Sequence, residues 1–348
     1  MRTRLLVILA GLLVLQVGAD ATPRFQYPAE GFRSKAAVRA WQQRTRAHLA
    51  GLLKLPPHTL GGSRENTRKP SARVLKEWSK DGLSFAEMEV NGAYSHRTVI
   101  LIAEKPKEGK AQHAEKRPAI LCLHGHGGDR YSVFDDDPNS PNAAYKAFAR
   151  RLAEQGFICA SIDVGRHEVS DPRFTVMGER LYDAVRAVDY LSSRDDVDAQ
   201  RIGCAGLSLG GEMAMWLGAM DTRVAAVVSA GFLTVMDQLE QNHCLCWKFP
   251  GLREAVDFPE IYGLIAPRRL QCQNGRQEPA TQFPVPLAES AFRRIQRIYT
   301  DLGAPHAAEW VAHPGGHEID LDALLRFFSV WLPATEPAPS PTRPPTRP

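Results

Sequence analysis

The sequence predicts an α/β protein in which a doubly wound, mostly parallel sheet is flanked by helices. Short apolar runs alternate with longer helix-forming runs over most of the 348 residues. The short runs are apolar throughout, as strands covered on both faces of a sheet should be. One of them leads directly into a Gly-x-Ser-x-Gly turn at 206–210, and a helix-forming run follows it. Repeated strand–helix units of this kind build a parallel sheet because their crossovers are right-handed.

One helix and one pair of antiparallel strands are expected before this alternation begins. Residues 35–54 place apolar side chains along one stripe at helical spacing, which predicts an amphipathic helix. After a polar connector, residues 84–90 and 98–103 have the composition of strands, and Asn91-Gly92 between them favours a tight turn. We therefore expect an antiparallel pair ahead of the parallel strands.

The rest of the chain alternates between strands and helices. Each short apolar run precedes a helix-forming run, so each crossover lays a helix on the sheet. Functional groups in such sheets gather in the loops beyond the C-terminal ends of the strands. The expected strands are 119–123, 157–162, 202–205, 224–229, 269–273 and 308–311, and the expected helices are 142–155, 176–193, 212–219, 285–302 and 320–331.

Both ends of the chain differ in composition from residues 22–332, which we expect to form one domain. Residues 1–21 join a basic start to an apolar run at 5–17 and to small residues, a pattern typical of a cleaved signal peptide. The apolar run is short for a membrane span, so we expect a secreted or periplasmic protein without stable membrane insertion; an uncleaved anchor is the alternative. Residues 333–348 alternate proline with small and polar residues, which predicts a disordered tail.

The charge of the chain points to no nucleic acid partner. The formal net charge is +4, and most of the excess lies in the two end segments. A body with so little net charge lacks the basic surface that nucleic acid binding needs. The sequence predicts no oligomeric state.

Six cysteines are present. An even number permits disulfides in a protein that leaves the cytoplasm, but four of them sit in apolar strand-like runs, where buried free thiols are expected. Cys244 and Cys246 are too close in sequence to bridge each other comfortably, and a bridge from either one to another cysteine stays open. The four cysteines in apolar runs are Cys122, Cys159, Cys204 and Cys272.

The turn at 206–210 predicts a catalytic nucleophile. A serine between two glycines, on a sharp turn from strand to helix, projects its hydroxyl above the edge of the sheet. Ser208 is therefore the expected nucleophile. The oxyanion of the tetrahedral intermediate needs two N–H donors. We expect one from the backbone of Leu209 and one from the glycine-rich loop at 124–128, where His126 is preferred over Gly127.

In a parallel sheet with this kind of serine turn, the nucleophile comes first along the chain, the acid second and the histidine last. The acid and the base should therefore follow Ser208. His317 lies in the glycine-rich loop after the last strand and is the expected general base, with His313 as the alternative. Glu278 follows the strand before it and is the expected acid that orients the imidazole. Asp237 and Glu240, which follow the 224–229 strand, are the alternative acids.

The sequence predicts neither a metal nor a cofactor. Three patterns offer ligand-type side chains, but none has the paired spacing that makes a zinc site convincing. They are His124-x-His126, His313-x3-His317 and His243-Cys244-x-Cys246.

A long connection at 231–266 is expected to cap the active site. It exceeds the usual length between two core strands and contains several aromatic residues, of which Trp247 is a candidate for contact with substrate. The loop after the 157–162 strand opens onto the same rim, which makes Arg166 and His167 further candidates.

With these residues in place, the chain resembles the α/β-hydrolase superfamily, and within it the bacterial branch of acetyl xylan esterase-like and dienelactone hydrolase-like proteins. The resemblance spans roughly 35–332. It implies an α/β-hydrolase fold and ester hydrolysis by a serine–histidine–acid triad with no cofactor. One departure is Glu278, which stands where that branch usually has aspartate. The motifs are His-Gly-His-Gly-Gly at 124–128, Asp-Ala-Val-Arg-Ala-Val-Asp-Tyr-Leu at 183–191, 201–211 with the serine turn, Leu-Ile-Ala-Pro-Arg at 264–268 and His-Pro-Gly-Gly-His at 313–317.

We therefore expect a secreted serine hydrolase that cleaves carboxylic esters, with acetyl esters of carbohydrates as favoured substrates. Its partner would be a small-molecule or carbohydrate ester. Two alternatives stay open: a serine peptidase of the prolyl-oligopeptidase kind, and a non-catalytic carbohydrate-binding protein on a hydrolase fold.

Overall fold

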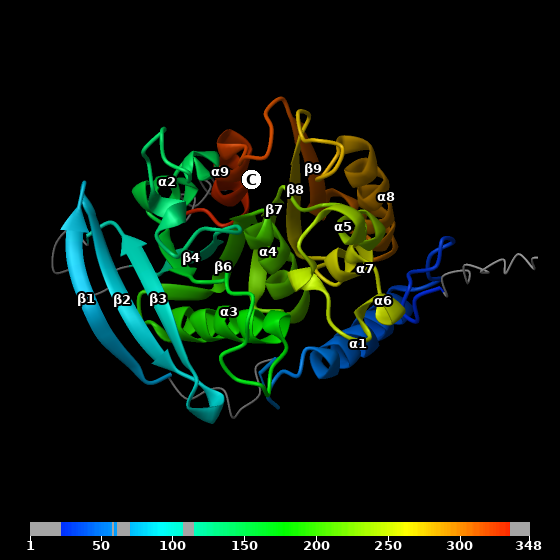
Figure 1. Cartoon of the computed structure of the whole chain (residues 1–348), viewed down its shortest axis with the longest axis horizontal. Coiled ribbons are helices and arrows are strands. Elements are labelled where there is room, and N and C mark those ends of the chain that lie inside the picture. Colours follow the sequence, from blue (N-terminus) through cyan, green and yellow to red (C-terminus); the bar gives the residue numbers. More distant parts are fainter. Residues whose placement is uncertain (1–21, 58, 61–69, 107–114, 335–348) are drawn as a thin grey trace, which may run out of the picture.

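The computed structural model describes residues 22–57, 59–60, 70–106 and 115–334, and its centre is a nine-stranded sheet (Figure 1). The expected signal peptide at 1–21 and nearly all of the expected tail lie outside these residues. Among the helices that are described, none is both long and apolar enough to cross a membrane.

The sheet combines a parallel body with an antiparallel edge, as the sequence predicted. Its strand order is β1-β2-β3-β5-β4-β6-β7-β8-β9. The strands from β5 to β9 in this order pair in parallel, whereas β1, β2 and β3 pair antiparallel and β3 joins β5 in the antiparallel sense. The strands are β1 Ala72–Lys80, β2 Leu83–Asn91, β3 Arg97–Glu104, β4 Arg117–Leu123, β5 Ile158–Ile162, β6 Val197–Leu207, β7 Val224–Ala230, β8 Arg269–Gly275 and β9 Ala308–His313.

Helices cover both faces of the sheet, so the inner parallel strands are buried on both sides. Leu121 and Leu123 of β4 face the core that α1, α3, α4, α7 and α8 share, and Ile120 and Cys122 face the core under α2 and α9. Figure 1 shows α3 along one side of the sheet and α2 and α9 along the other. The helices are α1 Lys35–Leu52, α2 Phe148–Glu154, α3 Val176–Ser193, α4 Leu209–Met220, α5 Met236–Asn242, α6 Leu252–Ala255, α7 Phe258–Gly263, α8 Val285–Asp301 and α9 Leu321–Trp331.

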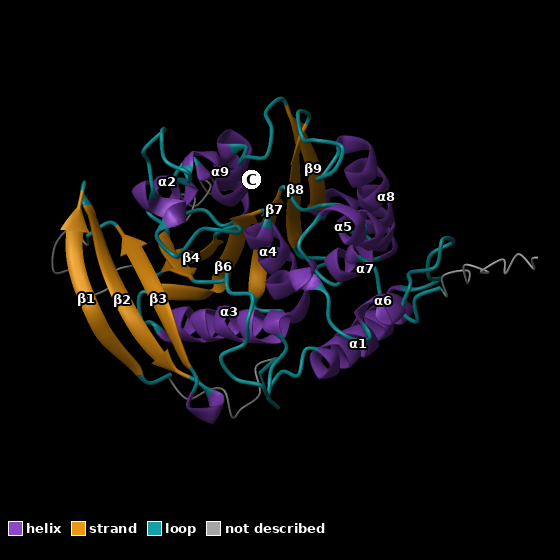
Figure 2. Ribbon diagram, in the orientation of Figure 1, coloured by secondary structure: helices purple, strands orange, loops and turns teal. Residues whose placement is uncertain are grey.

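Strand β1 was not predicted. Most of its side chains are exposed, so its sequence lacks the apolar run that marks the inner strands. Pairing with β2 holds it instead, and the two form the curved outer edge of the sheet (Figure 2). The expected turn at Asn91-Gly92 is also longer than predicted. Strand β2 continues through Asn91, and the chain reverses over 92–96, where Tyr94 and Ser95 have positive φ.

The helix expected at 142–155 is wrong in its first half. Residues Ala143–Tyr145 form a 3-10 turn, Lys146 and Ala147 adopt left-handed backbone angles, and α2 begins only at Phe148. The break turns the chain before α2 and leaves the carbonyl of Ala144 to accept the N–H of Ile319, ahead of α9.

The 231–266 insert folds into the three short helices α5, α6 and α7 rather than an irregular loop. Trp247 and Phe249 of this insert are buried. All six cysteines are free thiols; the four in apolar runs are buried as predicted, Cys244 is exposed and Cys246 is half-buried.

Arg268 fastens the end of the insert to the sheet. Its guanidinium donates to the carbonyls of Asp221 at 3.1 Å and Val224 at 2.6 Å, and to the carbonyl of Gly218 near the end of α4. Burial lowers the pKa of Arg268, but the three carbonyls hold the cation in place. The Leu-Ile-Ala-Pro-Arg motif therefore has a structural reason for its final arginine.

Replacing Arg268 with methionine should destabilise the fold by about 3 kcal/mol, because the buried carbonyls lose their donor. The change is measured as a fall in the urea midpoint of unfolding. Arg293→Met, on the exposed face of α8, is the control and should leave the midpoint nearly unchanged. Equal midpoints for the two variants would contradict this role.

Candidate active site

Ser208 occupies a strained turn between β6 and α4. Its backbone angles are φ 61° and ψ −123°, in a region that residues with a side chain rarely adopt. The turn is held on both sides. The N–H of Ser208 donates to the carbonyl of Ala230 at 2.9 Å, and a Cβ at position 210 would lie 2.1 Å from the carbonyl oxygen of Leu123. Glycine is therefore required at 210, and the Gly-x-Ser-x-Gly pattern has a steric cause.

His317 and Glu278 form a buried dyad at the end of the sheet. Nδ1 of His317 lies 2.8 Å from Oε1 of Glu278. The Glu278 side chain is only 1% exposed, whereas that of His317 is 30% exposed. The second carboxylate oxygen of Glu278 has no hydrogen-bond partner among the described residues. Among the described residues, the Glu278 side chain therefore hydrogen-bonds only to Nδ1 of His317, and Nε2 of His317 is not engaged by the carboxylate.

The loops after β8 and β9 hold this dyad by backbone contacts. The N–H of Arg276 donates to the carbonyl of His313 at 2.8 Å, and the N–H of Gln277 donates to the carbonyl of Gly315 at 3.0 Å. A Cβ at Gly275 would lie 2.0 Å from the carbonyl oxygen of Gly316. The two loops pack too closely for any side chain there, which brings Glu278 beneath the histidine loop.

Two neighbours link the dyad to the elbow serine. The ring of His317 lies against Gly231, where an added Cβ would be 2.8 Å from Cε1, and Gly231 directly follows Ala230, the acceptor of the Ser208 N–H. Phe283 stacks on His317 with ring centroids 5.5 Å apart and lines the same cavity as Ser208. The structure thus pairs His317 with Glu278 and places the imidazole beside Gly231, one residue from the strand end that holds the serine turn.

His313 has a structural position. It is the last residue of β9, it is 5% exposed, and its Nδ1 accepts the N–H of Gly315 at 3.3 Å. Burial lowers the pKa of His313. This neutral, buried ring shapes the loop that presents His317.

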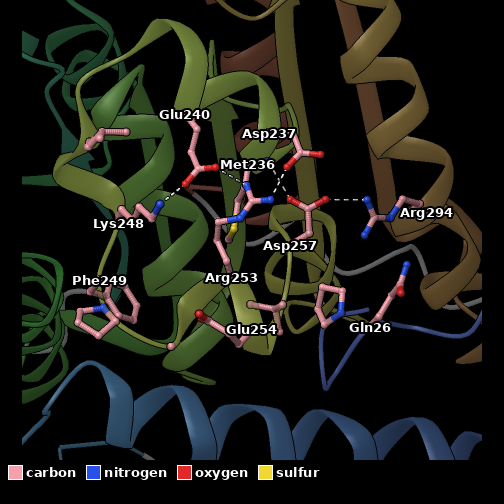
Figure 3. Close-up of a pocket in the computed structure, with 15 residues that line it drawn as sticks. Gln26, Met236, Asp237, Glu240, Lys248, Phe249, Arg253, Glu254, Asp257 and Arg294 are labelled. Carbon is pink, nitrogen blue, oxygen red and sulfur yellow. Dashed lines mark hydrogen bonds and ion pairs between the residues drawn. The ribbon is translucent and has the colours of Figure 1, made fainter. Parts of the chain in front are cut away.

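The alternative acids lie in a separate hollow of about 910 Å³, between the insert and residues 23–26 (Figure 3). Arg253 lies between Asp237 and Glu240 and pairs with both, and Lys248 also pairs with Glu240. Among the described residues, neither carboxylate forms a hydrogen bond or ion pair with His317. Glu278 is the acid that does.

The expected oxyanion donors flank the serine. Leu209 is the first residue of α4, where the backbone N–H has no intrahelical acceptor. The neighbouring loop after β4 is fastened by the N–H of Gly125, which donates to the hydroxyl of Tyr145 at 2.6 Å. In the described part of the chain the N–H of His126 makes no hydrogen bond. Leu209 and His126 line the same cavity as Ser208.

That cavity is small, about 60 Å³, and its walls combine aromatic and aliphatic side chains with polar ones. The insert supplies most of the wall opposite the serine. Its lining residues are His126, Ser208, Leu209, Glu212, Phe232, Leu239, His243, Cys244, Cys246, Trp247 and Phe283.

The three substrate candidates occupy different places. Trp247 is 2% exposed, lines the cavity and packs edge-on against Phe258. His167 stacks on the ring of His126 with centroids 5.2 Å apart. Arg166 is bound to Asp183 at 3.2 Å and lines a neighbouring hollow, outside the cavity that holds the serine.

Sequence reasoning missed Glu212, a fully buried acid in the wall of this cavity. Burial raises its pKa to about 8, and the charge of Arg180 opposes the shift. Its position four residues after Ser208, on a helix that begins there, is a signal that could have found it, because side chains at i and i+4 share a helix face. Phe283 and Tyr145 were also missed, and no local pattern marks either of them.

His126 is neutral at physiological pH. Burial, together with the nearby charge of Arg180, lowers its pKa to about 4.

Comparisons with known proteins found both sequence relatives and solved structures of similar fold. Residues 149–255 match the model of the prolyl oligopeptidase family. The candidate hydrolase YtaP of Bacillus subtilis is 27% identical over 271 residues, which cover 70% of this chain and 86% of YtaP. The quorum-quenching protein AidA of Acinetobacter baumannii is 30% identical over 115 residues, which cover 32% of this chain and 34% of AidA.

Solved structures share the whole architecture. A candidate acetyl xylan esterase from Bacteroides fragilis superposes with a TM-score of 0.64 at 19% identity, covering 84% of this chain and 78% of that one. A glucuronoyl esterase from Solibacter usitatus superposes with a TM-score of 0.62 at 16% identity, covering 90% of this chain and 97% of that one. The chain has the α/β-hydrolase fold. The predicted fold class is therefore confirmed.

The raised pKa of Glu212 should make the free energy of unfolding depend on pH. In the folded protein Glu212 stays protonated up to about pH 8, whereas in the unfolded chain it ionises above its ordinary pKa of 4.5. The unfolded state therefore binds fewer protons in this window, and stability falls as pH rises through it. Glu212→Gln should be more stable than the wild type at pH 7, on the order of 2–3 kcal/mol, with little difference at pH 4.

Urea unfolding at pH 4, 6 and 8 measures this difference. Glu289→Gln, at an exposed position on α8, is the control and should follow the wild type at every pH. A gap between Glu212→Gln and wild type that did not grow from pH 4 to pH 8 would refute the assignment of a protonated acid.

Proposed function

We propose that this α/β-hydrolase is a serine esterase that cleaves carboxylic esters outside the cytoplasm, with acetyl esters of carbohydrates as its preferred substrates. The observation that carries the proposal is the 2.8 Å hydrogen bond between His317 and the buried Glu278. The His317 ring lies against Gly231, one residue after the carbonyl that accepts the N–H of the elbow serine. A buried carboxylate that orients an imidazole is the arrangement that activates a serine hydroxyl.

The reaction follows from these roles. The bond from Nδ1–H of His317 to Glu278 sets the tautomer, so that Nε2 takes the proton of Ser208 as its oxygen attacks the carbonyl carbon. A tetrahedral intermediate forms, and His317 returns the proton to the departing alcohol. Water then attacks the acyl-enzyme with the same base, which releases the acid and restores Ser208.

The oxyanion is stabilised by two backbone donors in this proposal. The N–H of Leu209 has no acceptor in its own helix, and the N–H of His126 comes from the loop after β4, which Tyr145 fastens. Donors held rigidly before the reaction contribute most when charge develops on the oxygen.

The size of the cavity supports a short acyl group. About 60 Å³ bounded by Phe232, Trp247 and Phe283 leaves room for few non-hydrogen atoms beyond the carbonyl. An acetyl group fits this description better than a long acyl chain does, and the exposed side of the His317 loop leaves the alcohol part of the ester in solvent. Similarity in fold to an acetyl xylan esterase and to glucuronoyl esterases also favours a carbohydrate ester.

A second candidate function is peptide hydrolysis. Residues 149–255, which match the prolyl oligopeptidase family, include the elbow serine, and peptidases of this kind use the same triad. The same purified enzyme should therefore be assayed on acetylated xylan and on proline-containing amides. Faster release of acetate favours the esterase, and faster amide cleavage would replace it with the peptidase.

Ser208→Ala should abolish hydrolysis of a chromogenic acetate ester, because no other group supplies the attacking oxygen, with a loss of roughly 10⁴-fold or more in kcat. The variant should also resist labelling by a fluorophosphonate probe, whereas wild type reacts. Ser192→Ala, on α3, is the matched control and should keep both activities. A wild-type protein that fails to react with the probe would favour a non-catalytic, carbohydrate-binding role.

Glu278→Gln should lower kcat by about 10²–10⁴-fold with little change in KM, since an amide no longer selects the correct imidazole tautomer. Glu278→Asp should recover part of the loss. Glu240→Gln is the control, since Glu240 pairs with Lys248 and Arg253. A large loss of activity in Glu240→Gln together with normal activity in Glu278→Gln would reverse the assignment of the acid.

A further inference from the structure

A cluster of two histidines and two cysteines lies beside the serine, and its side chains have no part in the proposed hydrolysis. His126 follows β4, His167 follows β5, and Cys244 and Cys246 belong to the insert after α5. The ligand-type atoms of all four lie within 4.8 Å of one another. None of the three ligand patterns noted in the sequence contains this set of residues. The four residues come from three loops that are far apart along the chain.

The spacing of the cluster is close to that of a tetrahedral metal shell. Ligand atoms around a zinc ion with Zn–N near 2.0 Å and Zn–S near 2.3 Å are about 3.3–3.8 Å apart. Nε2 of His126 already lies 3.2 Å from Sγ of Cys246. The rings of His126 and His167 stack within 9° of parallel, so one of the two rings must turn before both imidazoles direct a lone pair at the same ion.

The donor set selects the kind of metal. Two thiols and two imidazoles are soft and borderline ligands that suit zinc, and the cluster offers no carboxylate or carbonyl set of the type that calcium or magnesium prefers. We propose that His126, His167, Cys244 and Cys246 form a zinc site.

Arg180 lies beside the cluster and can act as an outer-shell donor. Nη1 of Arg180 lies 3.5 Å from Sγ of Cys246, where it can donate to a thiolate bound to the ion, and its other nitrogens are held by the carbonyl of Arg166. Two thiolates neutralise Zn²⁺, so the positive arginine does not oppose binding. Outer-shell donors of this kind orient metal ligands.

The ion has a structural role in this proposal. Four protein ligands fill the tetrahedral shell of zinc and leave no position for water. His126, Cys244 and Cys246 also line the cavity of Ser208, so the ion fastens the insert to the loops after β4 and β5 at the wall of that cavity. The site is thus independent of the serine chemistry and can be tested without a substrate.

The test measures metal content directly. The full-length protein, reduced and folded, is equilibrated with Zn²⁺, freed of excess metal and analysed for zinc; a parallel sample with Co²⁺ is examined for the thiolate charge-transfer and tetrahedral ligand-field absorption bands. We expect one zinc per chain, and we expect chelation to lower the thermal midpoint of wild type.

Cys246→Ser and His167→Ala should each weaken zinc binding by roughly 100-fold or more and abolish the effect of the chelator on the midpoint. Cys204→Ala and the exposed His306→Ala are the matched controls and should bind zinc as wild type does. Circular dichroism establishes that each variant is folded.

The proposal is overturned if the reduced, folded wild type retains far less than one zinc per chain, or if Cys246→Ser and His167→Ala bind as tightly as the controls. It is also overturned if mass analysis finds Cys244 and Cys246 joined in a disulfide that persists in the protein equilibrated with zinc. Zinc content does not depend on Ser208, so the zinc measurement can be interpreted even if the esterase proposal fails.

Discussion

The first turn of α4, wedged between β4 and β7, is the constraint on which the rest of the site depends. The carbonyl of Leu123 faces the Cα of Gly210, and the carbonyl of Ala230 faces that of Gly211, in both cases too closely for a Cβ. This fit forces the chain to reverse in a single residue, which leaves Ser208 with a positive φ. Such a conformation costs about 1–3 kcal/mol by itself. The hydrogen bond from Ser208 to Ala230 and the buried surface of α4 offset that cost.

The same strand ends organise the dyad. Because β7, β8 and β9 are neighbours and run parallel, the loops after them meet at one edge of the sheet. Gly231 after β7, Glu278 after β8 and His317 after β9 therefore come together, although nearly ninety positions separate the first from the last. Backbone hydrogen bonds between the loops after β8 and β9 hold Glu278 and His317 next to each other.

The insert between β7 and β8 closes the site and changes its polarity. Its fold buries Trp247 and places Cys244 and Cys246 near His126. They also exclude water from Glu212, which raises the pKa of that acid. A small cavity beside the serine, a protonated acid and a cluster of soft ligands thus depend on one structural element.

The sequence by itself determined the order of the inner strands and the long helices, the serine turn, and Glu278 and His317 as the pair to expect, because continuous apolar runs and glycine positions are local signals. Only the tertiary structure decided what those signals do not encode. Strand β1 lacks an apolar run and exists through its pairing with β2. Lys146 and Ala147 break a helix that composition alone would continue. His126, His167, Cys244 and Cys246 meet only because three loops fold onto one rim, and no spacing along the chain records that meeting.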